Sequence, residues 1–183
     1  MSDTFEDTEL AGLRRLLDRQ AVLECVLNSC RGIDRGDWAL FRSAYHDDAV
    51  EDHGVYVGGL DGLLEFLKVA MSGFASFQRY LTNSKVDIDG DEAHVESYYL
   101  IRLCQPGATT LMVNGGRYLD RLARRERWGI VNRVVTSEWF ATLEGSGTAE
   151  TPDSPSVFVA PRMDQEDLSY QRPLQVTRSI PSP

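Results

Sequence analysis

Four long strand-like segments follow one another in the second half of the sequence, with only short turns between them. They span residues 77–88, 93–103, 109–122 and 128–140. Each is rich in β-branched or aromatic residues, which favour extended structure. The separators have turn chemistry, since 89–91 is Asp-Gly-Asp, 105–107 is Gln-Pro-Gly and 124–127 is a charged run. Strands joined by such short turns pair with their neighbours in sequence, so the pattern predicts an antiparallel meander.

Helical spacing of apolar residues predicts three helices before these strands. In residues 9–31 the apolar side chains return at steps of three and four, which indicates a long amphipathic helix with one face on the core. A short helix is expected over 38–45, capped by Asp37, and a third over 61–71. Residues 49–57 predict two short strands around a turn. Helices first and a sheet after them predict an α+β domain with the helices on one sheet face.

The end of the chain differs in composition from the rest. Six of the seven prolines lie between Pro152 and Pro183, in a stretch that is also rich in serine. We therefore divide the chain into an N-terminal lead over 1–8, one globular domain over 9–140 and a tail over 141–183. The tail is expected to cover either a cavity or a partner subunit.

The charge balance excludes several classes of partner. The chain has 19 Lys and Arg against 28 Asp and Glu, a net charge of -9, which disfavours nucleic acid and anionic membrane surfaces. No apolar run approaches the roughly 18 residues that span a bilayer, and the first seven residues are acidic, so we expect a cytoplasmic protein. Cys25, Cys30 and Cys104 fit no disulfide framework or zinc site, and we expect buried free thiols.

Several motifs occur in an order and spacing that resemble one family. Residues 32–38 read Gly-Ile-Asp-Arg-Gly-Asp-Trp, 46–50 read His-Asp-Asp-Ala-Val, 79–83 read Arg-Tyr-Leu-Thr-Asn, and 115–118 read Gly-Gly-Arg-Tyr. Over about residues 9–140 the chain resembles the SnoaL-like branch of the nuclear transport factor 2-like superfamily. The resemblance implies a cone, in which a curved antiparallel sheet packs on three helices around an internal apolar cavity.

The resemblance leaves the reaction open. Members include dehydratases, a dehydrochlorinase, epoxide hydrolases, isomerases, polyketide cyclases and non-catalytic binders, and their chemistry typically needs no metal and no organic cofactor. We expect the same here, with neither a cofactor nor a metal. Because one fold serves so many activities, the residues of the site must decide between them.

Asp34 and Arg79 occupy two positions that the resemblance marks as catalytic. In dehydratase and dehydrochlorinase members an Asp at the position of Asp34 orients a His, which removes a proton. Here Arg79 stands at the His position, while Leu81 and Asn83 keep the rest of the motif. An arginine stays protonated and cannot act as a general base, but it can stabilise negative charge in a dry cavity. A structural ion pair without chemistry is the alternative.

His53 is the leading candidate for the missing base. The chain has three histidines; His46 falls in a predicted polar turn, and His94 alternates with polar residues on an outward strand face. His53 could equally be a surface or packing residue. Strand alternation and position add residues that would line the cavity and bind substrate: Trp38, Tyr45, Tyr56, Asn83, Tyr99 and Asn132.

These residues predict a cofactor-independent lyase that acts by elimination on a small hydrophobic or aromatic molecule. His53 or Asp34 would handle the proton and Arg79 would stabilise the negative charge. A narrower form is C–C cleavage that releases formaldehyde from a lignin-derived diaryl compound, as lyases of the same superfamily do. The alternatives are an isomerase or cyclase that uses the same cavity, and a non-catalytic small-molecule-binding module.

The outward face of the predicted sheet is expected to be a subunit interface. His94, Glu96, Tyr98 and Arg102 share this face, which the helices leave uncovered. Members of the resembled family are usually dimers or trimers, so we expect a homodimer or homotrimer.

Overall fold

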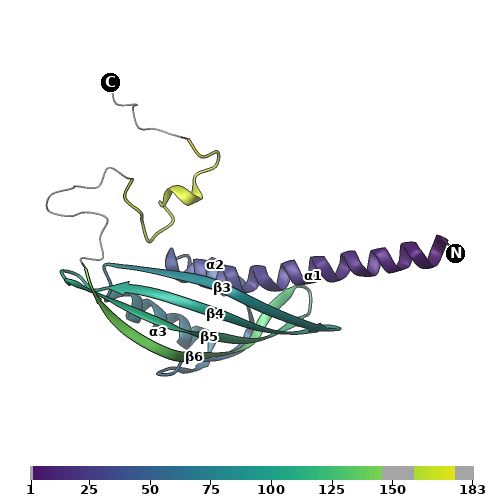
Figure 1. The fold of residues 1–183 in the computed structure, drawn as a ribbon, viewed down its shortest axis with the longest axis horizontal. Coiled ribbons are helices and arrows are strands. Elements are labelled where there is room, and N and C mark those ends of the chain that lie inside the picture. Colours follow the sequence, from purple (N-terminus) through teal and green to yellow (C-terminus); the bar gives the residue numbers. More distant parts are fainter. Residues whose placement is uncertain (1, 146–158, 176–183) are drawn as a thin grey trace.

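The computed structural model describes residues 2–145 and 159–175 as an α+β structure (Figure 1). Its helices are α1 (Ser2–Asp34), α2 (Trp38–Ser43), α3 (Leu60–Ser72) and the single 3-10 turn η1 (Leu168–Tyr170). Its strands are β1 (Tyr45–Asp52), β2 (Val57–Gly59), β3 (Ser76–Asp89), β4 (Glu92–Cys104), β5 (Thr110–Arg124) and β6 (Trp128–Glu144). None of the helices described is long and apolar enough to span a membrane.

The predicted meander forms the larger part of a curved sheet. Strands β3, β4, β5 and β6 pair antiparallel in sequence order, within a six-stranded sheet of order β2-β1-β6-β5-β4-β3. Strand β1 joins β6 in parallel, so the sheet as a whole is mixed. This strand begins at Tyr45, and His46 therefore lies in a strand rather than in the expected turn, with its Nε2 2.9 Å from the Ala123 carbonyl oxygen.

The helices pack on the concave face of the sheet, as expected (Figure 1). The core joins Val26 of α1 and Leu63 of α3 to Val95, Leu122 and Ile130 of the strands. Helix α2 is capped by Asp37, whose side chain accepts a hydrogen bond from the Leu40 amide. The three cysteines are free and buried, as predicted.

The sheet has several register shifts, and two of them change the face on which predicted site residues lie, because an extra residue shifts every later side chain to the other face. In β3 the register with β4 shifts between Leu81 and Ser84, so Ser84 points inward and Asn83 is exposed. The placement of Asn83 in the cavity wall is therefore wrong.

The second shift lies between β5 and β6. It falls between Arg121 and Leu122, and beyond it Arg133 of β6 is buried while Asn132 lies on the outer face. There the side-chain oxygen of Asn132 accepts hydrogen bonds from Arg121. The prediction that Asn132 lines the cavity is also wrong.

Only the second half of α1 follows the prediction of one core-facing stripe. Val22, Val26 and Ile33 are buried on the sheet side. The leucines near the start of the helix are 50% to 65% exposed: Leu10, Leu13, Leu16 and Leu17. The reason is length, because the helix begins at Ser2 and its first part projects past the end of the sheet (Figure 1).

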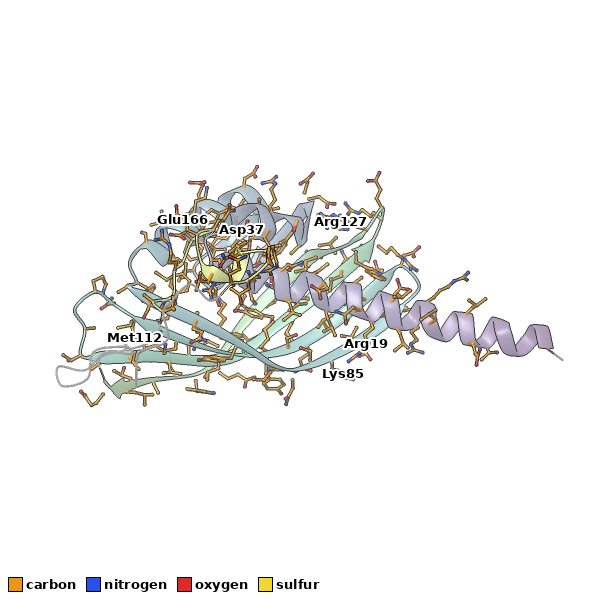
Figure 2. The ribbon with its side chains drawn as sticks, turned by 90° about the horizontal axis from the view of Figure 1, so that it is seen from above. Arg19, Asp37, Lys85, Met112, Arg127 and Glu166 are labelled. Carbon is orange, nitrogen blue, oxygen red and sulfur yellow. The ribbon has the colours of Figure 1, made fainter. Side chains whose placement is uncertain are left out.

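Residues 159–175 of the tail lie against the junction of α1 and α2. The Tyr170 hydroxyl donates to Asp37 (2.9 Å), Arg31 donates to Ser169 (3.1 Å), and Arg35 pairs with Asp167 at 3.6 Å. Figure 2 shows this segment, marked by Glu166, beside Asp37. The tail therefore contacts the end of α1, directly beside Asp34.

The contact between α1 and α2 depends on the glycine at position 32. A Cβ there would lie 2.6 Å from the Phe41 amide nitrogen, whereas a Cβ at Gly12 of the same helix would meet nothing within 4 Å. We predict that Gly32→Ala destabilises the fold by about 1–3 kcal/mol through overpacking. Gly12→Ala should instead stabilise it by up to ~1 kcal/mol. Urea unfolding of both variants tests this, and equal effects would contradict it.

Candidate functional site

Asp34 and Arg79 meet, as the sequence analysis predicts. Arg79 donates from its Nη1 to Asp34 Oδ1 at 2.5 Å, and its backbone amide donates to Asp34 Oδ2 at 3.0 Å. The Arg79 side chain is 3% exposed and that of Asp34 15%. Both carboxylate oxygens are thus used to hold one residue of β3 against the end of α1.

One nitrogen of the Arg79 guanidinium is left over. Its Nη2 lies 3.6 Å from Met71 Sδ of α3, and its Nε is buried without a hydrogen-bond partner among the residues described. A buried, unsatisfied donor on a positive group is costly unless something accepts from it. Arg79 Nε–H is therefore a candidate contact for an oxygen or a halide of a bound molecule.

A second buried ion pair lies deeper in the interior. Arg133 of β6 donates from Nε and Nη2 to the two oxygens of Asp120 on β5, at 2.6 and 2.9 Å. Its Nη1 donates to Ser29 of α1 (2.9 Å) and to the Tyr45 hydroxyl of β1 (3.0 Å). The side chains of Arg133 and Asp120 are 2% and 0% exposed. This one guanidinium ties together a helix and three strands.

Tyr45 connects this pair to a carboxylate–imidazole pair. The Tyr45 hydroxyl donates to Glu51 Oε2 at 2.7 Å, and Glu51 Oε1 lies 2.5 Å from His53 Nδ1. Burial would raise the pKa of the Glu51 carboxyl, but the hydrogen bond to His53 and the positive charge of Arg133 outweigh burial and lower that pKa. An ionised Glu51 can only accept, so the proton of this hydrogen bond lies on Nδ1 of His53.

The Asp34–Arg79 pair and the group around Arg133 both lie inside the curved sheet. Tyr118 lies beneath the guanidinium of Arg133, 4.6 Å from ring centroid to Cζ, and stacks on Tyr99 at 4.6 Å. Tyr118, Tyr99 and Cys30 form one small buried cluster. Burial raises the pKa of Cys30 and of Tyr118, which keeps both protonated and makes them poor bases.

Of the other predicted site residues, two are buried and two are partly exposed. Tyr45 and Tyr99 are buried; the Tyr99 hydroxyl donates to Asn114 (2.8 Å). Tyr56 is half-buried beside Phe66, which also packs against the His53 ring, and Trp38 packs on Phe41.

The sequence analysis missed Asp120, Arg133 and Glu51. Asp120 could have been identified from the sequence, because it shares the inward face of β5 with Tyr118 and Leu122, and a charged residue on a buried face needs a partner of opposite charge. Arg133 had none, since the register shift in β6 conceals which face it occupies.

The interior is therefore more charged than the expected apolar funnel. A hollow of about 370 Å³ lies on the outer sheet face, where Glu96, Leu119 and Val134 are among the residues that line it. Within the part of the chain that the structure describes, no three His, Cys, Asp or Glu side chains form a group that could hold a metal ion. The internal cavity stays a prediction.

A curved sheet with helices on its concave side and paired charges inside defines a cone-shaped α+β protein with a charged interior. Residues 14–134 match the family model of the SnoaL-like domain, and the chain therefore belongs to the SnoaL-like family. The resemblance stated from the motifs is confirmed. No curated protein matches the sequence.

Solved structures share the fold at low sequence identity. The hexachlorocyclohexane dehydrochlorinase LinA-type3 of Novosphingobium barchaimii has a TM-score of 0.67 at 20% identity, over 77% of this chain and 99% of that one. A scytalone dehydratase-like protein of Novosphingobium aromaticivorans has a TM-score of 0.64 at 16% identity, over 74% and 97%. A protein of unknown function from Nostoc punctiforme, with a cystatin-like fold, reaches 0.56 at 17%, over 67% and 92%. At these identities the likeness shows the fold alone.

Removing Asp120 should cost far more stability than removing an exposed acid. Asp120→Ala leaves Arg133 buried without its counter-charge, and we predict a loss of about 3–5 kcal/mol in the free energy of unfolding. The matched control is Asp48→Ala, which breaks the exposed pair with Arg125 and should change stability little. Chemical denaturation measures both, and similar losses would contradict a buried pair.

Glu51 should make stability depend on pH on the acid side. Its native pKa lies below the ordinary value of 4.5, so its ionised form stabilises the fold above that pH. This contribution is lost as the pH falls through the lowered native pKa. We therefore expect Glu51→Gln to be less stable than the wild type at neutral pH, with the difference shrinking as the pH falls below 4.5. Parallel stability curves from urea unfolding at a series of pH values would refute this.

Proposed function

We propose that this protein is a cofactor-independent lyase that catalyses an elimination on a small hydrophobic, cyclic or aromatic molecule. The observation that carries the proposal is the hydrogen bond between Glu51 and His53 at 2.5 Å, with the carboxylate buried and 3% exposed. A buried carboxylate that fixes the tautomer of an imidazole is the usual construction of a general base.

His53 is the base in this proposal. Its side chain is 24% exposed, and its Nε2 has no hydrogen-bond partner in the described part of the chain. Nε2 removes a proton from a substrate carbon, and the electron pair of that C–H bond forms the new C=C bond. Asp34 is the weaker candidate, because both of its oxygens already accept from Arg79.

Arg79 assists the leaving group. The departing hydroxide or halide takes the electron pair of its bond to carbon, and the free Nε–H of Arg79 supplies a positive, desolvated donor for it. A departing hydroxide then takes the proton from His53 and leaves as water.

Helix α3 brings the base and the arginine toward one region. Phe66 packs against the His53 ring with the centroids 5.9 Å apart, and Met71 contacts Arg79. These two residues of α3 are five positions apart, about 7–8 Å along the helix axis. The stacked rings of Tyr56 and Phe66 beside His53 favour an aromatic or other apolar substrate.

The test is turnover of a panel of cyclic and aromatic compounds that carry a hydroxyl or halide next to an acidic C–H bond. Product mass identifies the reaction, since elimination removes water or hydrogen halide and isomerisation leaves the mass unchanged. Lignin-type diaryl compounds with formaldehyde detection test the narrower C–C cleavage. Binding of these compounds without any turnover would favour the non-catalytic module.

Substitution of His53 provides the residue-level prediction. We expect His53→Gln to lower kcat by about 10²- to 10⁴-fold, the usual contribution of a positioned base, with little change in stability. The matched control is His94→Gln, an exposed histidine of β4, which should leave kcat unchanged. An equal, small effect of both variants would exclude His53 as the base.

A further inference from the structure

Tyr118 differs from the other buried tyrosines in its hydroxyl group. Buried tyrosines usually hydrogen-bond through this group, as Tyr45 does to Glu51 and Tyr99 does to Asn114. Tyr118 is 5% exposed, yet its hydroxyl bonds to no residue that the structure describes. Burial raises the pKa of Tyr118, so the hydroxyl stays protonated. It is therefore a donor without an acceptor.

A second donor without an acceptor, Nε of Arg79, lies on the same inward face of the sheet. The register of β3 with β4 sets Arg79 opposite Ile101 and Leu81 opposite Tyr99. Tyr99 in turn stacks on Tyr118 with the ring centroids 4.6 Å apart. Burial raises the pKa of both tyrosines, and the positive charge of Arg79 opposes this rise, which fits their proximity. Arg79 and Tyr118 therefore flank the same tyrosine ring.

The other guanidinium beside Tyr118 has no such spare nitrogen. Arg133 lies with its Cζ 4.6 Å from the centroid of the Tyr118 ring, and all three of its nitrogens already donate to protein oxygens. Only Arg79 combines a buried positive charge with an Nε–H that nothing in the described residues accepts. Two unused donors in one region, one of them charged, call for a negatively charged acceptor.

The surroundings of these two donors are apolar. Tyr118 and Tyr99 belong to one small buried cluster, against which Leu81, Leu103 and Val135 pack. These three aliphatic residues are only partly buried, so the cluster lies close to the surface. With few competing waters, a hydrogen bond to a charged acceptor is stronger than in bulk solvent. The region thus suits an anion that is compact or carries an apolar group.

We propose that Arg79 and Tyr118 together bind a compact anion, either a halide ion or the negatively charged oxygen of an organic molecule. Nε–H of Arg79 and O–H of Tyr118 both donate to it. An aromatic carboxylate or phenolate would place its ring against the neighbouring aliphatic side chains. In turnover the same two donors hold the departing halide or hydroxide, and this role alone rests on the proposed lyase function.

Calorimetric titration of the full-length chain with sodium bromide and with sodium benzoate, at constant ionic strength, tests the site. We expect saturable binding of at least one of these anions; bromide reports on a halide and benzoate on an anionic oxygen. Tyr118→Phe removes only the hydroxyl and should raise the Kd by about tenfold or more, the usual loss for a hydrogen bond to a charged group. The control Tyr98→Phe makes the same change on an exposed tyrosine of β4 and should leave the Kd unchanged.

Stability in a halide-free buffer separates this role of Tyr118 from a structural one. Tyr118→Phe breaks no hydrogen bond among the residues described, so its urea midpoint should equal that of the wild type. Tyr45→Phe is the matched comparison, because it also removes the hydroxyl of a buried tyrosine but loses the bonds with Arg133 and Glu51. Its midpoint should be clearly lower.

Three results would overturn the anion site. They are a wild type that binds neither anion, an equal Kd for the wild type and Tyr118→Phe, and a loss of stability in Tyr118→Phe as large as in Tyr45→Phe. None of them depends on turnover. If an anion binds through Tyr118 but no compound of the panel reacts, the site stands and the proposed function fails. If elimination proceeds while Tyr118→Phe changes neither the Kd nor kcat, the function stands and the site fails.

Discussion

The buried ion pair between Arg133 and Asp120 is the contact on which the interior of this protein depends. A guanidinium has five donors in one rigid plane, and Arg133 uses four of them to join β6 to β5, to Ser29 of α1 and to the Tyr45 hydroxyl of β1. The same hydroxyl holds Glu51, and Glu51 holds His53. The orientation of an imidazole near the surface is therefore set by a charge pair in the core, which links the stability of the sheet to the geometry of the proposed base.

Periodicity and turn chemistry predicted the architecture well, because both are local properties of the chain. The meander and the Asp37 cap follow from the sequence in this way, and the motif resemblance adds the contact of Asp34 with Arg79. The errors at Asn83 and Asn132 have one cause, since an unpaired residue in a strand reverses every later side chain and leaves no clear mark in composition. The exposed start of α1 is a different case, because helical spacing reveals an apolar stripe but not what it packs against.

Because position 79 is arginine rather than histidine, the proposed general base is His53 and does not lie on β3. Asp34 still anchors the residue opposite it, but the pair now provides a fixed positive group with its Nε–H unpaired among the described residues instead of a base. The carboxylate–imidazole pair of Glu51 and His53 then lies at the end of β1, which β6, β5 and β4 separate from β3 in the sheet. The curvature of the sheet and helix α3, which contacts both sides, make such a transfer of roles geometrically reasonable within the family fold.

The charges around Asp34 and Arg79, and around Arg133, Asp120 and Glu51, favour His53 as the base and Arg79 as the group that stabilises negative charge. Asp34, Glu51 and Asp120 carry three negative charges, and Arg79 and Arg133 carry two positive ones, so with a neutral His53 these five groups leave one negative charge. A proton that moves from substrate to His53 brings the same set to neutrality. In a medium of low dielectric constant an unbalanced charge is expensive, so a base that balances its surroundings by accepting a proton avoids that cost. Removing either arginine would leave these groups with two negative charges, so protonation of His53 would no longer bring the set to neutrality.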